Sequence, residues 1–98
     1  MGGEELVQRG YRITGRVQGV FFRAWTRETA EALGVRGTVR NRGDGSVEAH
    51  ALGSSEVLGR FEARLREGPR AARVERVEVQ ESTEAVPPAP FRILPTAP

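Results

Sequence analysis

GRVQGVFFR, from Gly15 to Arg23, joins an apolar strand to a helix, and the arrangement of the other elements follows from this junction. Its two glycines permit a tight backbone. Because the loop lies directly before a helix, several main-chain N–H groups lack partners and point into one concavity. Arg23 stands at the helix start, where its planar guanidinium and the positive end of the helix dipole both attract an anion. The stretch therefore predicts a phosphate-binding loop.

Length and composition favour one small domain. The 98 residues match a single domain over residues 1–98. No apolar run approaches a membrane span, and residues 1–5 lack the basic and apolar segments of a signal peptide. Without cysteine, the chain has no disulfide, thiolate nucleophile or cysteine metal site. We expect a cytoplasmic protein with no membrane partner and no cofactor or metal, and a monomer because no spare apolar stripe remains.

The charge pattern is more informative than the formal net charge of +2. All 15 basic residues are arginine. The segment from Arg9 to Arg42 contains eight arginines and only two acidic residues, Glu28 and Glu31, so its formal charge is +6. Such a segment attracts a small anion or a nucleic-acid backbone, and charge alone does not choose between them.

Apolar spacing predicts a strand and a helix in the first third of the chain. Residues 1–9 are expected to be a frayed lead-in. Tyr11, Ile13 and Val17 then alternate with polar residues, as in a half-buried strand. Apolar residues at spacings of three and four indicate a helix over about 23–33.

The middle of the chain indicates a hairpin and a second helix. Strands over about 35–40 and 46–52 enclose a dense turn signal at 41–45. An apolar stripe from Val57 to Leu65 then predicts a helix that ends at Gly68-Pro69. We place the aromatic side chains of both helices in the core, namely Phe22, Trp25 and Phe61.

A fourth strand contains Val77 and Val79. Val74 is out of phase with them, so the strand either begins near Arg76 or contains a bulge. The proline-rich segment 85–90 is linker-like, and residues 91–94 are a possible short edge strand.

This order of elements predicts an α+β fold, the ferredoxin-like split βαβ sandwich (βαββαβ), with an antiparallel sheet and both helices on one face. Right-handed crossovers make the first two strands parallel, with the third strand between them. The loop after the first strand and the turn after the second therefore emerge at the same end of the sheet. We expect Arg23 and Asn41 to face one site there.

The residue types present exclude several phosphatase mechanisms. With no cysteine, one histidine and one aspartate in a turn, the chain lacks a thiolate, a histidine nucleophile and a carboxylate-metal cluster. Main-chain N–H groups and Arg23 remain, and one such donor is typically worth about 3 to 4 kcal/mol in a transition state. That suffices for an activated substrate such as a carboxylic-phosphoric anhydride, whose leaving carboxylate has a pKa of about 4 to 5 and needs no general acid.

Asn41 is the only asparagine of the chain. Its carboxamide both accepts and donates hydrogen bonds, so it can hold a water in line with phosphorus while the bound phosphate accepts the proton. The alternative is that Asn41 simply forms a turn, as asparagine often does.

These residues resemble the two signature regions of the acylphosphatase family, which correspond here to residues 15–23 and to 37–41 with 44–48. The resemblance covers residues 10–94. It implies a ferredoxin-like enzyme that hydrolyses acyl phosphates without metal, with Arg23 on the substrate phosphate and Asn41 on the water. Inorganic phosphate would be product and inhibitor. The amides implied to form the phosphate cradle are those of Val17, Gln18, Gly19, Val20, Phe21 and Phe22.

Thr38 and the proline-rich tail depart from the family pattern, because many members have an aromatic residue at the position of Thr38. Both departures bear on turnover and stability rather than on the type of reaction.

Two other functions stay open on the sequence alone. The fold is shared with RNA-binding domains, although the strand at Val47–Leu52 has no aromatic platform for stacking bases. A domain that binds anions without catalysis is the second alternative. We expect no nucleic-acid partner, and we expect His50, opposite in phase to Val47, to be an exposed residue without a role.

Overall fold

The computed structural model describes residues 5–98. Their secondary structure follows the predicted order, and the possible edge strand predicted over 91–94 is present as a strand of two residues. The elements are β1 (Leu6–Arg16), α1 (Phe22–Leu33), β2 (Arg36–Asn41), β3 (Val47–Ser54), α2 (Ser55–Glu67), β4 (Arg73–Glu81) and β5 (Arg92–Ile93).

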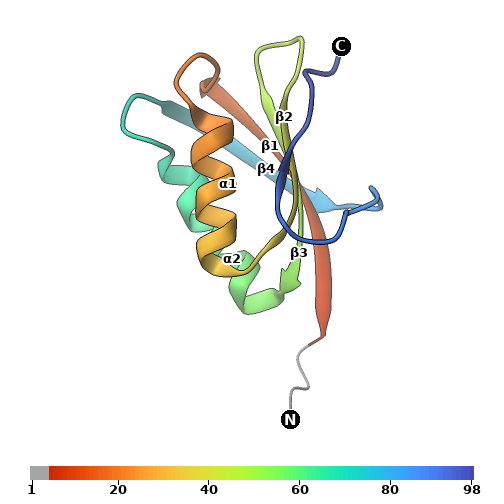
Figure 1. Cartoon of the computed structure of the whole chain (residues 1–98). Coiled ribbons are helices and arrows are strands. Elements are labelled where there is room, and N and C mark those ends of the chain that lie inside the picture. Colours follow the sequence, from red (N-terminus) through yellow and green to blue (C-terminus); the bar gives the residue numbers. More distant parts are fainter. Residues whose placement is uncertain (1–4) are drawn as a thin grey trace.

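The strands form one sheet in the order β4-β1-β3-β2-β5, and α1 and α2 lie together on one of its faces (Figure 1). β3 is antiparallel to both β1 and β2, so β1 and β2 run in the same direction. The predicted ferredoxin-like sandwich is therefore confirmed. One edge differs from the expectation, because β5 pairs in parallel with β2 and makes the sheet mixed.

The sheet begins earlier than the sequence suggested. β1 starts at Leu6, which pairs with Ser54, so residues 6–9 belong to the sheet and the frayed lead-in predicted over 1–9 is wrong for them. Polar side chains at Gln8 and Arg9 hid this extension from the apolar pattern. Residues 1–4 lie outside the described part of the chain.

A bulge in β4 resolves the phase of Val74. Thr14 pairs with Arg76, but the next residue, Gly15, pairs with Val74, so Glu75 has no counterpart on β1. Gly15 has φ 126°, and a Cβ there would lie 2.2 Å from the Arg73 carbonyl oxygen. Only glycine permits this close approach at the point where the chain leaves the sheet for the loop.

The core lies between the helices and one face of the sheet. Alternate residues of β1 and β3, such as Ile13 and Ala49, are fully buried against Phe61 of α2. The prediction that Trp25 lies in the core needs correction, because this residue is only half-buried and packs at the margin of the core. One face of its ring instead meets the guanidinium of Arg64, 5.6 Å from the ring centroid.

The chain after β5 continues along β2. The main-chain N–H of Leu94 donates to the Val39 oxygen, and that of Ala97 donates to the Asn41 oxygen. The N–H of Gly43 donates back to Ala97. These bonds hold the end of β2, and with it the backbone of Asn41, in a fixed position.

Candidate active site

The two strand ends predicted to meet do so. One cavity of about 330 Å³ contains both Arg23 and Asn41. It lies where the loop between β1 and α1 comes close to the end of β2. Its lining residues are Val17, Gly19, Phe21, Phe22, Arg23, Ala24, Asn41 and Ile93.

Buried side chains anchor the loop at both of its ends. Val17 and Phe22 are 1% and 2% exposed, so their side chains are committed to the core. Between them, Gly19 has φ 75° and Phe21 has φ 62°. A bulky residue in the left-handed region costs on the order of 1 to 2 kcal/mol, and such strain is typical of functional sites.

The start of α1 offers unpaired donors to the cavity. Among residues 5–98, no side chain caps the helix, and the first turn of the helix contains no acidic residue. The first N–H with an acceptor inside the helix is that of Trp25, which donates to the Phe21 oxygen over 3.0 Å. The N–H groups of Phe22, Arg23 and Ala24 therefore have no acceptor within the helix, and the dipole makes this end attractive to an anion.

Arg23 and Asn41 present unengaged polar groups. Over residues 5–98, no ion pair or hydrogen bond occupies the Arg23 guanidinium or the Asn41 carboxamide. Both side chains are partly exposed. A cation and an amide with free capacity thus share one cavity with the helix N-terminus.

Gln18 has a role that sequence reasoning missed. Its side-chain Nε2 donates to the main-chain oxygens of Arg42 and Ser46, each over 2.8 Å. It does not line the cavity, and neither does Val20, which faces an adjacent groove. The Gln18 carboxamide ties the loop to the turn after β2 and so fixes Arg23 relative to Asn41. Its one sequence signal was a polar side chain among apolar ones.

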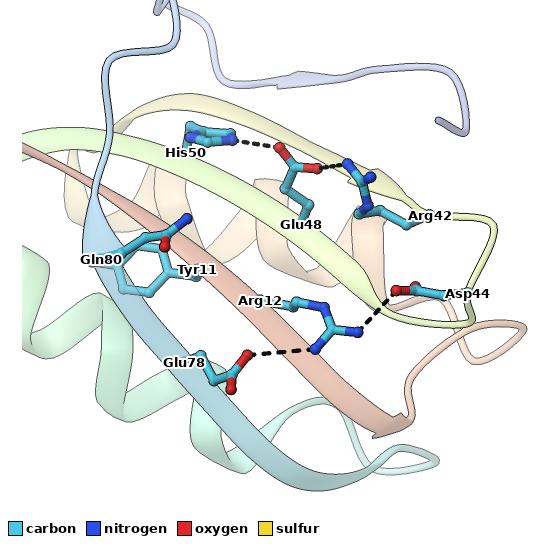
Figure 2. Close-up of a pocket in the computed structure, with 8 residues that line it drawn as sticks. All are labelled: Tyr11, Arg12, Arg42, Asp44, Glu48, His50, Glu78 and Gln80. Atoms are coloured by element: carbon cyan, nitrogen blue, oxygen red, sulfur yellow. Dashed lines mark hydrogen bonds and ion pairs between the residues drawn. The ribbon is translucent and has the colours of Figure 1, made fainter. Parts of the chain in front are cut away.

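A second cavity of similar size lies on the face of the sheet away from the helices (Figure 2). Its charged side chains neutralise one another. Arg12 contacts Asp44 at 2.8 Å and Glu78 at 3.4 Å, while Arg42 contacts Glu48. None of the predicted site residues lines this cavity.

His50 lies at this second cavity and is not the exposed residue that we expected, since its side chain is only 12% exposed. It contacts Glu48 through Nε2 and Ser82 through Nδ1, over 2.5 and 2.6 Å. Gln8 and the Glu84 main-chain N–H both donate to Ser82 Oγ, so the hydroxyl proton is left for Nδ1. This assigns the imidazole proton to Nε2, which donates to Glu48. The contact with Ser82 joins positions 32 residues apart, which is why the strand pattern did not predict it.

The carboxylates of this face are held in their charged form. Burial alone would raise the pKa of Glu48, but hydrogen bonds from His50 and Arg42 outweigh it and the pKa is lowered. Hydrogen bonds from the Ser46 hydroxyl and from Arg12 hold the pKa of Asp44 far below its usual range. These groups are anions that complete ion pairs.

Within residues 5–98, no helix is long and apolar enough to cross a membrane. The same residues contain no cluster of three or more histidine, aspartate or glutamate side chains that could hold a metal ion.

Fold and site together define a small ferredoxin-like protein in which Arg23 and Asn41 line one cavity at the start of the first helix. Comparison with known proteins is consistent with this class. The acylphosphatase family model matches residues 9–93. The chain belongs to the acylphosphatase family.

Relatives and solved structures agree with this assignment. The chain is 56% identical over 69 residues to an acylphosphatase from Rhodopseudomonas palustris, covering 70% of each chain. It is 48% identical over 83 residues to one from Mesorhizobium japonicum, covering 85% of this chain and 88% of the relative. The structure of an acylphosphatase from Coxiella burnetii matches with a TM-score of 0.83 and 33% identity, over 96% of this chain and all of that one. As a family member, the chain is a hydrolase of acyl phosphates.

Proposed function

We propose that Arg23 and the main-chain amides from Val17 to Phe22 hold the phosphoryl group of an acyl phosphate, while Asn41 orients the attacking water. The convergence of Arg23, Asn41 and the uncapped start of α1 on one cavity carries this proposal. A guanidinium can grip two phosphate oxygens at once, and the amides can engage the remaining charge.

The proposed step is a direct displacement at phosphorus. The water oxygen forms a bond to phosphorus as the bond from phosphorus to the acyl oxygen breaks. The carboxylate departs with the bonding electron pair, and a phosphate oxygen accepts the proton of the water. The products are a carboxylate and inorganic phosphate, which occupies the same cradle and therefore inhibits.

This machinery suits the bond that it has to break. One donor of an oxyanion site is typically worth about 3 to 4 kcal/mol. A carboxylate with a pKa of about 4 to 5 leaves without protonation, so the cavity needs no acid beside the departing oxygen. Its lining residues contain none. We propose that hydrolysis requires neither a metal nor a cofactor.

Release of inorganic phosphate from benzoyl phosphate tests the proposal, with and without a chelator of divalent metals. We expect release well above the buffer rate and no effect of the chelator. Release at the buffer rate would contradict hydrolysis, whereas loss of activity with the chelator would contradict the metal-free mechanism.

The nucleic-acid alternative finds no support in the helix-free face of the sheet. The cations of its cavity, Arg12 and Arg42, are engaged by carboxylates. Tyr11, the aromatic residue at this cavity, is 2% exposed and its hydroxyl lies against Glu62 on α2. A stacking platform needs exposed aromatic rings. The monomeric state and the cytoplasmic location stay predictions.

A further inference from the structure

An open, largely apolar groove lies beside the phosphate cavity. Its walls come from the β1–α1 loop, from the first turns of α1 and from the segment that leads into β4. The apolar residues that line it are Val20, Phe21, Ala24, Trp25, Pro69 and Ala71. Phe21 and Ala24 line the phosphate cavity as well, so the two sites are contiguous.

The groove and Asn41 lie on opposite sides of the phosphate-binding loop. β2, which ends with Asn41, is separated from β4 in the sheet by β3 and β1. Figure 1 shows the same order at the upper end of the molecule: the turquoise α2–β4 loop, then the orange β1–α1 loop, then the yellow-green β2–β3 hairpin. Residues 69–71 of the groove therefore face the loop from the side away from Asn41.

The position of the groove relative to Asn41 matters for an in-line displacement at phosphorus. The leaving group departs on the side of phosphorus opposite the attacking oxygen. If Asn41 holds the water, the acyl oxygen points away from Asn41, toward the side where residues 69–71 form the groove. This step rests on the proposed function, because it takes the position of the water from Asn41.

Phe21 indicates which acyl groups this side favours. This residue is 85% exposed, and its backbone is in the left-handed region. Trp25 supplies a second aromatic ring, which packs on Phe22 with centroids 5.5 Å apart. The charged residues of the groove are Glu28 and Arg70, whose opposite charges give no net preference for an ionised acyl group.

We propose that this groove is the acyl subsite and that it selects acyl phosphates with an apolar, preferably aromatic, acyl group over those with a small one. Phe21, Trp25 and Ala71 are its specificity-determining residues. An aromatic acyl group gains contact with two rings and removes the exposed face of Phe21 from water. An acetyl group offers only a methyl group for such contacts.

Ala71→Trp, which fills the groove, tests the proposal, with Ala63→Trp on the exposed surface of α2 as the matched control. For the wild type, we expect kcat/KM for benzoyl phosphate to exceed that for acetyl phosphate by about tenfold or more, the range of differences set by apolar pockets. Ala71→Trp should lower the benzoyl value at least fivefold relative to the acetyl value. The inhibition constant of inorganic phosphate should stay unchanged, because phosphate does not enter the groove. Ala63→Trp should change none of these quantities.

Equal kcat/KM values for the two substrates in the wild type would overturn the proposal, as would an equal loss for both in Ala71→Trp. Failure to hydrolyse either substrate would instead contradict the proposed function. A measurement on the wild type tests the proposal even if Ala71→Trp does not fold. With phosphate bound, benzoate should shift the NMR resonances of the Trp25 indole and the Ala71 amide. Acetate should not. Benzoate shifts that avoid these groups would also overturn the proposal.

Discussion

The two cavities of this protein are similar in size, about 330 Å³ each, and both contain arginine, yet they differ in what the arginine contacts. On the helix-free face, Arg12 and Arg42 are balanced by carboxylates (Figure 2). At the start of α1, and within the described residues, no carboxylate approaches Arg23 within ion-pair distance. Cavity size alone therefore does not distinguish a site from a structural network.

The difference shows how charge pairing separates stability from binding. A guanidinium that already contacts a carboxylate has its charge balanced and attracts an anion less strongly, and its contacts tie neighbouring strands and turns together. A guanidinium beside unpaired helix amides keeps its hydrogen bonds for an anion. Substitutions that remove charge should thus affect activity in one cavity and stability in the other.

The largest effect is expected for Arg23→Lys. Lysine keeps the charge but loses the planar fork that grips two oxygens. We expect kcat/KM for benzoyl phosphate to fall by about 10² to 10³ fold, the range found on removal of one oxyanion donor. Phosphate should also inhibit much more weakly. Activity within about threefold of the wild type would contradict the assigned role.

Asn41→Ala should separate binding from turnover. Loss of the carboxamide removes the group that positions water, so we expect kcat to fall about 10² fold. Inorganic phosphate should still bind with nearly its original inhibition constant. A constant that rises as steeply as kcat falls would place Asn41 in the phosphate cradle instead.

Gln18→Ala should give an intermediate effect. The change removes both hydrogen bonds between the loop and the turn after β2, so Arg23 and Asn41 lose their fixed spacing. We expect about a tenfold fall in kcat/KM together with weaker phosphate inhibition. Gln18→Met keeps the volume without the donor and serves as the control: it should match Gln18→Ala if the hydrogen bonds matter, and match the wild type if only packing does.

His50→Ala should leave activity within about twofold, because His50 lies at the other cavity. It should instead lower the free energy of unfolding by about 1 to 3 kcal/mol, since it leaves the partly buried Glu48 and Ser82 with fewer partners. Urea unfolding followed by fluorescence of Trp25 measures this change. A His50→Ala variant with the stability of the wild type but reduced activity would contradict the assignment of stability to this cavity and of activity to the other.

The smallest effect concerns pH. Folding lowers the pKa of Glu48 and of Asp44, so both groups contribute stability above their unfolded pKa, about 4. That contribution is lost as the pH falls through the lower folded values. We expect the free energy of unfolding of the wild type to decrease below about pH 4, as measured by urea unfolding at several pH values. The free energy of unfolding of Asp44→Asn should decrease less steeply over the same range. Equal slopes for the two proteins would contradict the Asp44 contacts.

The sequence predicted those parts of the site that depend on short-range pattern and on handedness. The glycines of the segment from Gly15 to Arg23, and the helix that follows it, predict the loop. The meeting of Arg23 with Asn41 follows from the direction of two crossovers, which chirality fixes. Both features can be derived without side-chain packing.

What the sequence did not predict depends on contacts between distant residues. The bonds from Gln18 to the turn after β2, and from His50 to Ser82, join positions 24 to 32 residues apart. The pairing of Leu6 with Ser54 and the parallel β5 likewise depend on which strand lies alongside. Such partners leave no periodic signal in their own segments, so only the folded chain reveals them.

A crystal structure determined in the presence of inorganic phosphate tests the central claim most directly. We predict phosphate in the cavity at the start of α1, in contact with the Arg23 guanidinium and the main-chain amides of the loop before it, and within one water molecule of Asn41. Phosphate bound by Arg12 or Arg42 on the helix-free face, with the loop from Val17 to Phe22 making no contact to it, would contradict the claim.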